Sequence, residues 1–360
     1  MLKKIRFPLL IFFAWQLLIL LFQIFVQPHY IITRDSETLF QRLFISWTSY
    51  WDAIHYLTIA ATGYEYPKQA FFPLWPLLIK TVALVGLPIA WVSYLLTFIL
   101  SVLNFILLFL LGKKLIGEQK AKWSLIFFSC YPAAIFLHAG YSENLFLFLS
   151  LLSFLLLENK KYYLSAICAG FVTACRIPGI AVTATFLFIK TSIKNKIFML
   201  LVGSLGLLAY MLFLYIHQGD FLYFIKAQQN WCGPAGRCGF TSPLKPVIDY
   251  LNLLWSGSER IGISFRFIDW FSSVVFLSLL GVVFKKLPKT YFLYSLIILL
   301  MPLSSGSTAS MVRITLTAFP IFLILPGILR NNYLKILLAL GLLFVEFRFV
   351  ALFSSYLWVA

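Results

Sequence analysis

Long apolar stretches recur along the whole chain, and short segments rich in lysine and arginine separate them. The 360 residues are 61% hydrophobic and 11% charged, whereas a soluble domain carries about 25% charged residues. So few charges cannot cover a surface that faces water. We therefore expect an all-α polytopic membrane protein whose main solvent is lipid.

The first apolar stretch follows three basic residues, Lys3, Lys4 and Arg6, as a signal peptide would. It runs over residues 7–26, which is long enough to cross a hydrocarbon core about 30 Å thick. The apolar part of a signal peptide is shorter, and no cleavage site of small residues follows this one. We expect an uncleaved first helix.

The net charge of +17 follows from where the basic residues lie. Six short segments hold 17 of the 29 lysines and arginines and only two acidic residues: 1–6, 112–122, 158–163, 190–196, 285–289 and 330–335. This is the positive-inside bias that orients membrane helices. It indicates topology rather than a nucleic-acid partner, with contact to anionic headgroups as a secondary possibility.

The basic segments predict the path of a single membrane domain over residues 1–360. Its N-terminus is cytoplasmic and its C-terminus lies outside, and two long outer loops cover residues 27–88 and 218–268. We expect about eleven membrane helices of GT-C type. Their ranges are 7–26, 89–111, 123–138, 143–157, 164–189 as a pair, 197–217, 269–284, 290–303, 313–329 and 336–353. The proline-containing stretch 71–88 is expected to dip in from the outer interface and to pack on protein.

The segment 164–189 has basic residues on both sides, so it must cross the membrane an even number of times. Its 26 residues are too few for two full crossings. We expect a buried hairpin of two short helices that turns at Pro178-Gly179, with Arg176 beside the turn.

The first outer loop carries the densest group of polar side chains. If residues 51–61 are helical, Asp52, His55 and Tyr56 share one face. A carboxylate held on an apolar helix at a membrane interface is typical of a general base. The alternative is that Asp52 caps the helix or forms a salt bridge with an arginine.

The same loop resembles a known family. Trp51-Asp52, His55-Tyr56-Leu57, Gly63-Tyr64 and Ala70-Phe71-Phe72-Pro73-Leu74 resemble the first luminal loop of PIG-V-type proteins, the second mannosyltransferases of glycosylphosphatidylinositol assembly, and their prokaryotic relatives. Similar patches follow at 131–146, 169–179 and 310–320. Ile314 stands where the last motif often has tyrosine.

The resemblance implies a GT-C glycosyltransferase that inverts the anomeric carbon. It would move mannose or a similar hexose from a polyprenyl-phosphate donor to a glycan, glycolipid or protein acceptor on the outer face. Asp52 becomes the general base, and no cofactor is implied beyond the donor. A compact chain of this kind suits a bacterial plasma membrane.

Two arginines inside membrane helices, Arg176 and Arg313, are candidates for the donor phosphate, with Arg237 as a weaker one. Arginine stays charged and presents a fork of donors. The alternative is that both pair internally with Glu143, Asp269 or Glu346. His55, Tyr56 and Glu143 are further candidates for substrate contact, although Glu143 also suits the first turn of a helix.

The cysteines and histidines give weaker predictions. Cys232 and Cys238 flank turn residues in the second outer loop, so a small disulfide loop and two free thiols are equally expected. Asp52 and His55 lack further ligands at a suitable spacing, so no metal site is expected.

Two other functions remain open at this stage. A flippase of lipid-linked sugars would share the broken helices, but it should carry its polar groups near the midplane of related halves. A non-catalytic subunit of a glycan-assembly complex would share the fold without turnover.

Overall fold

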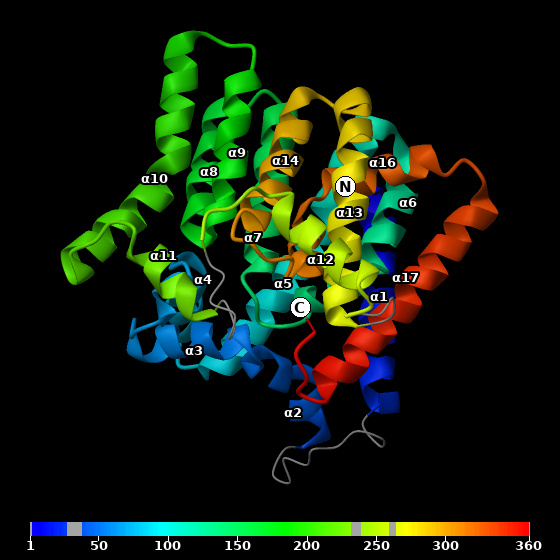
Figure 1. The fold of residues 1–360 in the computed structure, drawn as a ribbon, viewed down its shortest axis with the longest axis horizontal. Helices are drawn as coiled ribbons and strands as arrows, with labels where there is room; N and C mark the ends of the chain where they lie inside the picture. The colour runs from blue at the N-terminus through cyan, green and yellow to red at the C-terminus, as the bar shows by residue number, and fades with distance from the viewer. Residues whose placement is uncertain (1, 27–37, 232–238, 259–263, 360) are drawn as a thin grey trace.

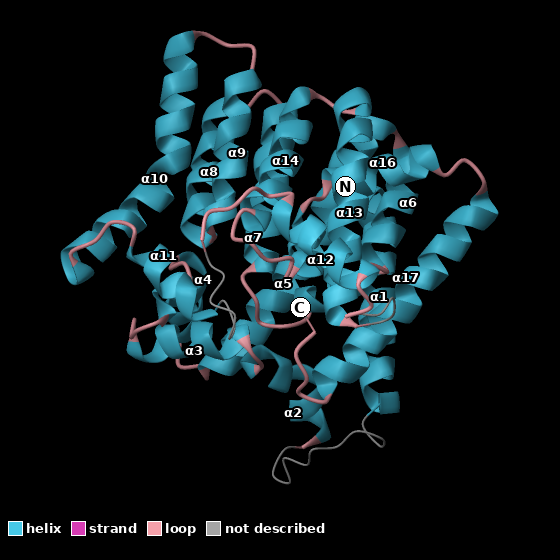
Figure 2. Ribbon diagram, viewed as in Figure 1, coloured by secondary structure: helices cyan, strands magenta, loops and turns pink. Residues whose placement is uncertain are grey.

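A computed structural model describes residues 2–26, 38–231, 239–258 and 264–359. Within these ranges the regular elements are all helices, as Figure 2 shows, and no strand occurs. The expectation of an all-α fold is confirmed.

Five helices in the described ranges are long and apolar enough to cross a membrane. They are α1 (Leu2–Val26), α5 (Ile89–Ile116), α10 (Ile193–Gln218), α13 (Phe265–Lys286) and α17 (Asn332–Ser354). A bent pair, α15 (Met311–Thr317) with α16 (Pro320–Ile328), would make a sixth span. The protein is therefore an integral, multi-pass membrane protein, and the count of about eleven helices stays a prediction.

Shorter helices complete the bundle that Figure 1 shows. Those of the bundle itself include α6 (Glu118–Ser129), η3 (Pro132–Leu137), α7 (Glu143–Glu158), α8 (Tyr162–Cys175) and α14 (Lys289–Leu303). The first outer loop forms α2 (Leu39–Phe44), η1 (Ser46–Ser49), α3 (Asp52–Thr62), η2 (Lys68–Ala70) and α4 (Leu74–Ala83). The second forms α11 (Tyr223–Gln228), η6 (Gln229–Trp231) and α12 (Lys245–Trp255).

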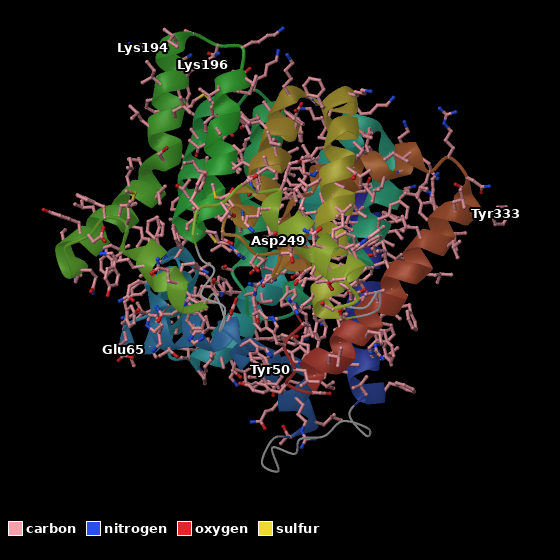
Figure 3. The ribbon with its side chains drawn as sticks, viewed as in Figure 1. Tyr50, Glu65, Lys194, Lys196, Asp249 and Tyr333 are labelled. Atoms are coloured by element: carbon pink, nitrogen blue, oxygen red, sulfur yellow. The ribbon has the colours of Figure 1, made fainter. Side chains whose placement is uncertain are left out.

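The basic segments contact one another at one end of the bundle. The Lys114 ammonium donates to Asn159 at 2.6 Å, and the Tyr163 hydroxyl donates to Asn195 at 3.2 Å. Figure 3 shows Lys194 and Lys196 at the end opposite to Glu65 of the first outer loop. These contacts bring the basic segments 112–122, 158–163 and 190–196 together at one end, and the assignment of that end to the cytoplasm stays a prediction.

The hairpin expected at 164–189 is observed with its turn at Pro178-Gly179, but it is only partly buried, because Ile167 and Leu187 are about half exposed. Its first limb is α8, and the chain returns through η4 (Ile177–Gly179), α9 (Ile180–Ala184) and η5 (Thr185–Phe188). Thr173 before the turn and Thr183 after it both donate to the Gly203 carbonyl, at 3.0 and 2.9 Å. A Cβ on Gly206 would lie 2.0 Å from the Gly170 carbonyl oxygen, so these glycines allow the hairpin to approach α10 closely.

The segment 313–329 differs from its prediction as one helix. It is broken between α15 and α16, which meet at 85°. Pro320 has no N–H to bond the carbonyl of Leu316, and this loss favours a break at that position. The bend ends α15 after two turns.

The proline-containing stretch at the end of the first outer loop forms a short helix, α4, packed on protein as expected. Pro73 and Pro76 lie at its N-cap and in its first turn, where a missing N–H costs no helical bond. Trp75 is fully buried and donates its indole N–H to the Gly140 carbonyl at 3.0 Å. This bond ties the first outer loop to the turn that precedes α7.

Candidate active site

Asp52 begins α3 immediately after a turn in the chain. Trp51 has φ of +51°, a value that residues other than glycine rarely adopt. Asp52 then lies in the first turn of the helix, where the dipole favours a negative charge. Its Oδ2 accepts a hydrogen bond from Nη1 of Arg313 at 2.7 Å.

Arg313 lies on α15, and a second carboxylate holds the start of that helix. Asp269 of α13 accepts backbone N–H bonds from Ser310 at 3.0 Å and from Val312 at 2.9 Å. Both amides belong to the end of α15 that has no partners within the helix. Asp269 therefore positions Arg313 without pairing with it directly.

Glu143 connects the two arginines. Its side chain is 2% exposed at the start of α7, and it forms an ion pair with Arg176. Its Oε1 also lies 3.2 Å from Nε of Arg313, an ion pair that lacks hydrogen-bond geometry. Asp52, Arg313, Glu143 and Arg176 thus form a continuous charged row, which we call the charged quartet. Of the three internal partners considered for the arginines, Glu143 is the one that forms an ion pair with both.

Aromatic rings surround the guanidinium of Arg313. Its central carbon lies 5.5 Å from the ring centroid of Phe136, 5.3 Å from Tyr141 and 5.7 Å from Trp358. The negative faces of aromatic rings attract a cation at such distances. These rings and the two carboxylates together stabilise a charge that is almost fully removed from solvent.

Arg176 is more accessible than Arg313. Its side chain is 23% exposed, against 9% for Arg313. It lines a cavity of about 30 Å³ with Phe146, Pro178, Ile314 and Thr317. This volume holds one or two water molecules. Arg176 is thus the arginine of the quartet that a ligand reaches first.

The two other polar residues of α3 have different partners. The Tyr56 hydroxyl lies 2.7 Å from Oγ of Ser142, and burial raises the pKa of Tyr56, which keeps the phenol neutral. The His55 ring packs between Phe71 and Trp231, with centroids 4.9 and 4.7 Å away. Burial lowers the pKa of His55, against the opposing charge of Asp52.

Several sequence-based candidates lie outside the described residues, namely Arg237, Cys232 and Cys238. Among the residues that the structure describes, no three histidine, cysteine, aspartate or glutamate side chains gather as a metal site would require. The absence of a metal requirement stays a prediction.

Two contributors to the site were missed from the sequence. Asp269 was considered only as a partner for an arginine, although a carboxylate within a membrane helix was a signal of some role. Trp358 gave no signal, because nothing in its neighbourhood points to a residue 45 positions earlier, Arg313.

Comparisons with known proteins agree with the predicted family. GPI mannosyltransferase 2 of Schizosaccharomyces pombe is 33% identical over 154 residues, which are 40% of this chain and 32% of that protein. GPI alpha-1,6-mannosyltransferase 2 of Homo sapiens is 32% identical over 145 residues, 37% of this chain and 29% of that protein. The chain therefore matches less than a third of the length of these curated relatives.

The fold also resembles a solved structure. The crystal structure of the Archaeoglobus fulgidus oligosaccharyltransferase in complex with Zn and sulfate superposes with a TM-score of 0.50 at 12% identity. The match covers 97% of this chain and 53% of that one, which shows a shared fold of GT-C type. The profile of the mannosyltransferase (PIG-V) family matches residues 13–229, a range that includes Asp52, Glu143 and Arg176. The chain belongs to the mannosyltransferase (PIG-V) family.

Proposed function

We propose that this protein is an inverting glycosyltransferase that moves mannose or a similar hexose from a polyprenyl-phosphate donor to an acceptor hydroxyl. The observation that carries the proposal is the charged quartet, which brings a carboxylate and two arginines together at the end of the bundle opposite the basic loops. The carboxylate can act as a base toward the acceptor hydroxyl, and the arginines can stabilise the negative charge of the donor phosphate.

Asp52 is the general base in this proposal. The acceptor oxygen attacks the anomeric carbon from the face opposite the phosphate, and its proton passes to the Asp52 carboxylate. The bond from the anomeric carbon to the phosphate oxygen breaks, and its electron pair leaves with the lipid phosphate. Arg313 bonds Oδ2 of Asp52, so it fixes the carboxylate while Oδ1 faces the acceptor.

Arg176 and Arg313 have different tasks in this proposal. Arg313 already binds Asp52 and Glu143 and is nearly inaccessible, which favours a positioning role. Arg176 lines the cavity and, among the residues that the structure describes, has one carboxylate partner, Glu143, which favours contact with the leaving phosphate. A sugar phosphate needs more room than about 30 Å³, so donor binding must widen the cavity between η4 and α15.

The remaining assignments are part of the same proposal. The acceptor is a glycan, a glycolipid or a protein on the outer face of a membrane, which we assign to a bacterial plasma membrane. His55 and Tyr56 lie on the helix of the base, where they contribute to substrate contact. The reaction needs no cofactor beyond the lipid-linked donor.

Replacement of Asp52 by asparagine tests the proposal. We expect transfer from labelled polyprenyl-phosphate mannose to fall by about 10²–10⁴-fold, because general base catalysis contributes that much. Asp249→Asn is the matched control, since Asp249 forms an exposed ion pair with Lys245 on α12. Size-exclusion profiles should match wild type for both variants.

The outcome also separates the other two functions. Equal transfer by Asp52→Asn and wild type would refute the role of the base. Movement of the intact lipid-linked sugar across vesicles, with no glycosidic bond formed, would favour a flippase. A wild-type chain that does neither alone and restores transfer by a second protein would favour a subunit role.

A further inference from the structure

Three aromatic side chains gather next to the proposed base. The Trp51 ring stacks on Tyr356 with centroids 5.0 Å apart and an angle of 17° between planes. It also meets Trp358 edge to face at 5.4 Å. Figure 1 shows that the chain after α17 turns back from the end of that helix toward the middle of the molecule. The last described residues therefore reach the charged quartet.

These three rings lie beside Asp52 and Arg313 of the charged quartet. Trp51 directly precedes Asp52 in the chain. Trp358 lies 5.7 Å from the central carbon of the Arg313 guanidinium, which itself bonds Asp52. A molecule bound to these rings would therefore lie next to Asp52, the proposed base.

The rings are also accessible, unlike the other rings around Arg313. Tyr356 is 42% exposed and Trp358 is 38% exposed, whereas Phe136 and Tyr141 are almost fully buried. Rings that served only to pack against the arginine would be covered in the same way. Open aromatic area beside a buried charged group is typical of a binding surface.

The indole N–H of Trp51 adds a polar requirement. It is buried and has no hydrogen-bond partner among the described residues. A buried donor without an acceptor is unfavourable, and in a native structure it indicates an unseen acceptor. Trp51 also has a φ value of +51°, and such strain is concentrated at functional sites.

We propose that Trp51, Tyr356 and Trp358 form a subsite for the ring of a hexose next to Asp52. The C–H bonds on one face of a pyranose are slightly positive, and they pack on the negative faces of aromatic rings. A hydroxyl oxygen of the same sugar accepts the Trp51 N–H. This inference rests on the proposed function and adds the residues that orient one of its two sugars, that of the donor or that of the acceptor.

The first experiment measures binding without turnover. Saturation-transfer difference NMR of the full chain in detergent, with methyl α-mannoside as probe, should lose at least fivefold in signal in Trp358→Ala. Trp358→Phe keeps a ring and should retain most of the signal. Trp255→Ala removes a tryptophan that is 91% exposed on α12, and it should bind as wild type does. Equal signals from Trp358→Ala and Trp255→Ala would overturn the proposal.

The second experiment identifies the sugar and separates the subsite from Arg313. We measure KM for the donor and for the acceptor in Trp358→Ala. The KM of one of them should rise about tenfold with kcat nearly unchanged, and that substrate carries the sugar that stacks on the ring. A fall in kcat alone would mean that Trp358 acts only through Arg313, which overturns the subsite. Trp358→Leu replaces the alanine variant if that one fails to fold. If wild type shows no transfer, the proposed function fails, while the binding result still decides the subsite.

Discussion

The two outer loops hold their charges in opposite ways. In the first loop, Asp52 pairs with Arg313 at 2.7 Å, and the two side chains are 21% and 9% exposed. In the second loop, Lys245 and Asp249 of α12 pair at the same distance, but their side chains are 55% and 37% exposed. The two ion pairs thus have the same distance, but they differ in how far their side chains are exposed.

The difference shows that a distance alone does not give the energetic weight of an ion pair. Exposed pairs contribute about 0.2–1 kcal/mol, because water competes and side-chain freedom is lost. A buried pair adds little net stability as a whole, but removal of one member leaves a charge without compensation. Loss of a charged partner should therefore destabilise the fold strongly at the first loop and only slightly at the second.

The largest expected effect is at Glu143, the carboxylate that joins the first loop's partner Arg313 to Arg176. Glu143→Ala should lower the free energy of unfolding by about 3–5 kcal/mol, because the buried Arg313 and the partly buried Arg176 lose their shared anion. Asp249→Ala in the second loop should change it by less than about 1 kcal/mol. Thermal unfolding in detergent measures both, and similar losses in the two variants would refute the contrast.

The next effect concerns how each loop anchors a tryptophan. Trp75→Phe in α4 removes the donor to the buried Gly140 carbonyl, which should cost about 1–3 kcal/mol. Trp255→Phe in α12 changes a side chain that is 91% exposed, so we expect a change within about 0.5 kcal/mol. Unfolding by denaturant compares the two variants directly. An equal cost would mean that the bond to Gly140 contributes nothing beyond packing.

A double-mutant cycle compares the two ion pairs themselves. Replacement of Asp52 and Arg313, singly and together, should give a coupling energy of about 0.5–3 kcal/mol, as for groups in one buried network. The same cycle on Lys245 and Asp249, which are four residues apart on a helix, should give about 0.3–0.5 kcal/mol. Concentrated salt should abolish the second coupling and spare most of the first. If salt weakens both coupling energies equally, the ion pair of Asp52 with Arg313 is as exposed to solvent as that of Lys245 with Asp249.

The local patterns of the sequence predicted two elements well, a helix of the first loop and the hairpin beside Arg176. The helix expected at 51–61 is observed at Asp52–Thr62, and the hairpin at Pro178-Gly179 turns as its basic flanks require. Both follow from the periodicity and charge of neighbouring residues. Helical spacing also predicted that Asp52, His55 and Tyr56 share one face of α3.

Local patterns could not predict which side chains Asp52 and the two arginines contact. Asp52 and Arg313 are 261 positions apart, and the approach of their helices depends on the bend at Pro320 and on the anchor at Asp269. The sequence left internal pairing and phosphate contact as alternatives for each arginine. Only the packed bundle shows that one carboxylate, Glu143, serves both. The return of Trp358 to the site is equally a matter of tertiary packing.

The smallest expected effect is a pH dependence at His55, where the two loops meet. Burial lowers the pKa of His55 below its usual value near 6.5, so the unfolded chain binds the proton more readily. Stability should therefore fall as the pH drops below about 6.5, and the charge of Asp52 weakens the effect. His55→Phe keeps the ring contacts with Phe71 and Trp231 but cannot titrate, so its melting temperature should decline less between pH 7 and pH 5. His217→Gln, at an exposed position near the end of α10, should follow wild type. Parallel curves for wild type and His55→Phe would show that protonation of this ring does not oppose the contact between the loops.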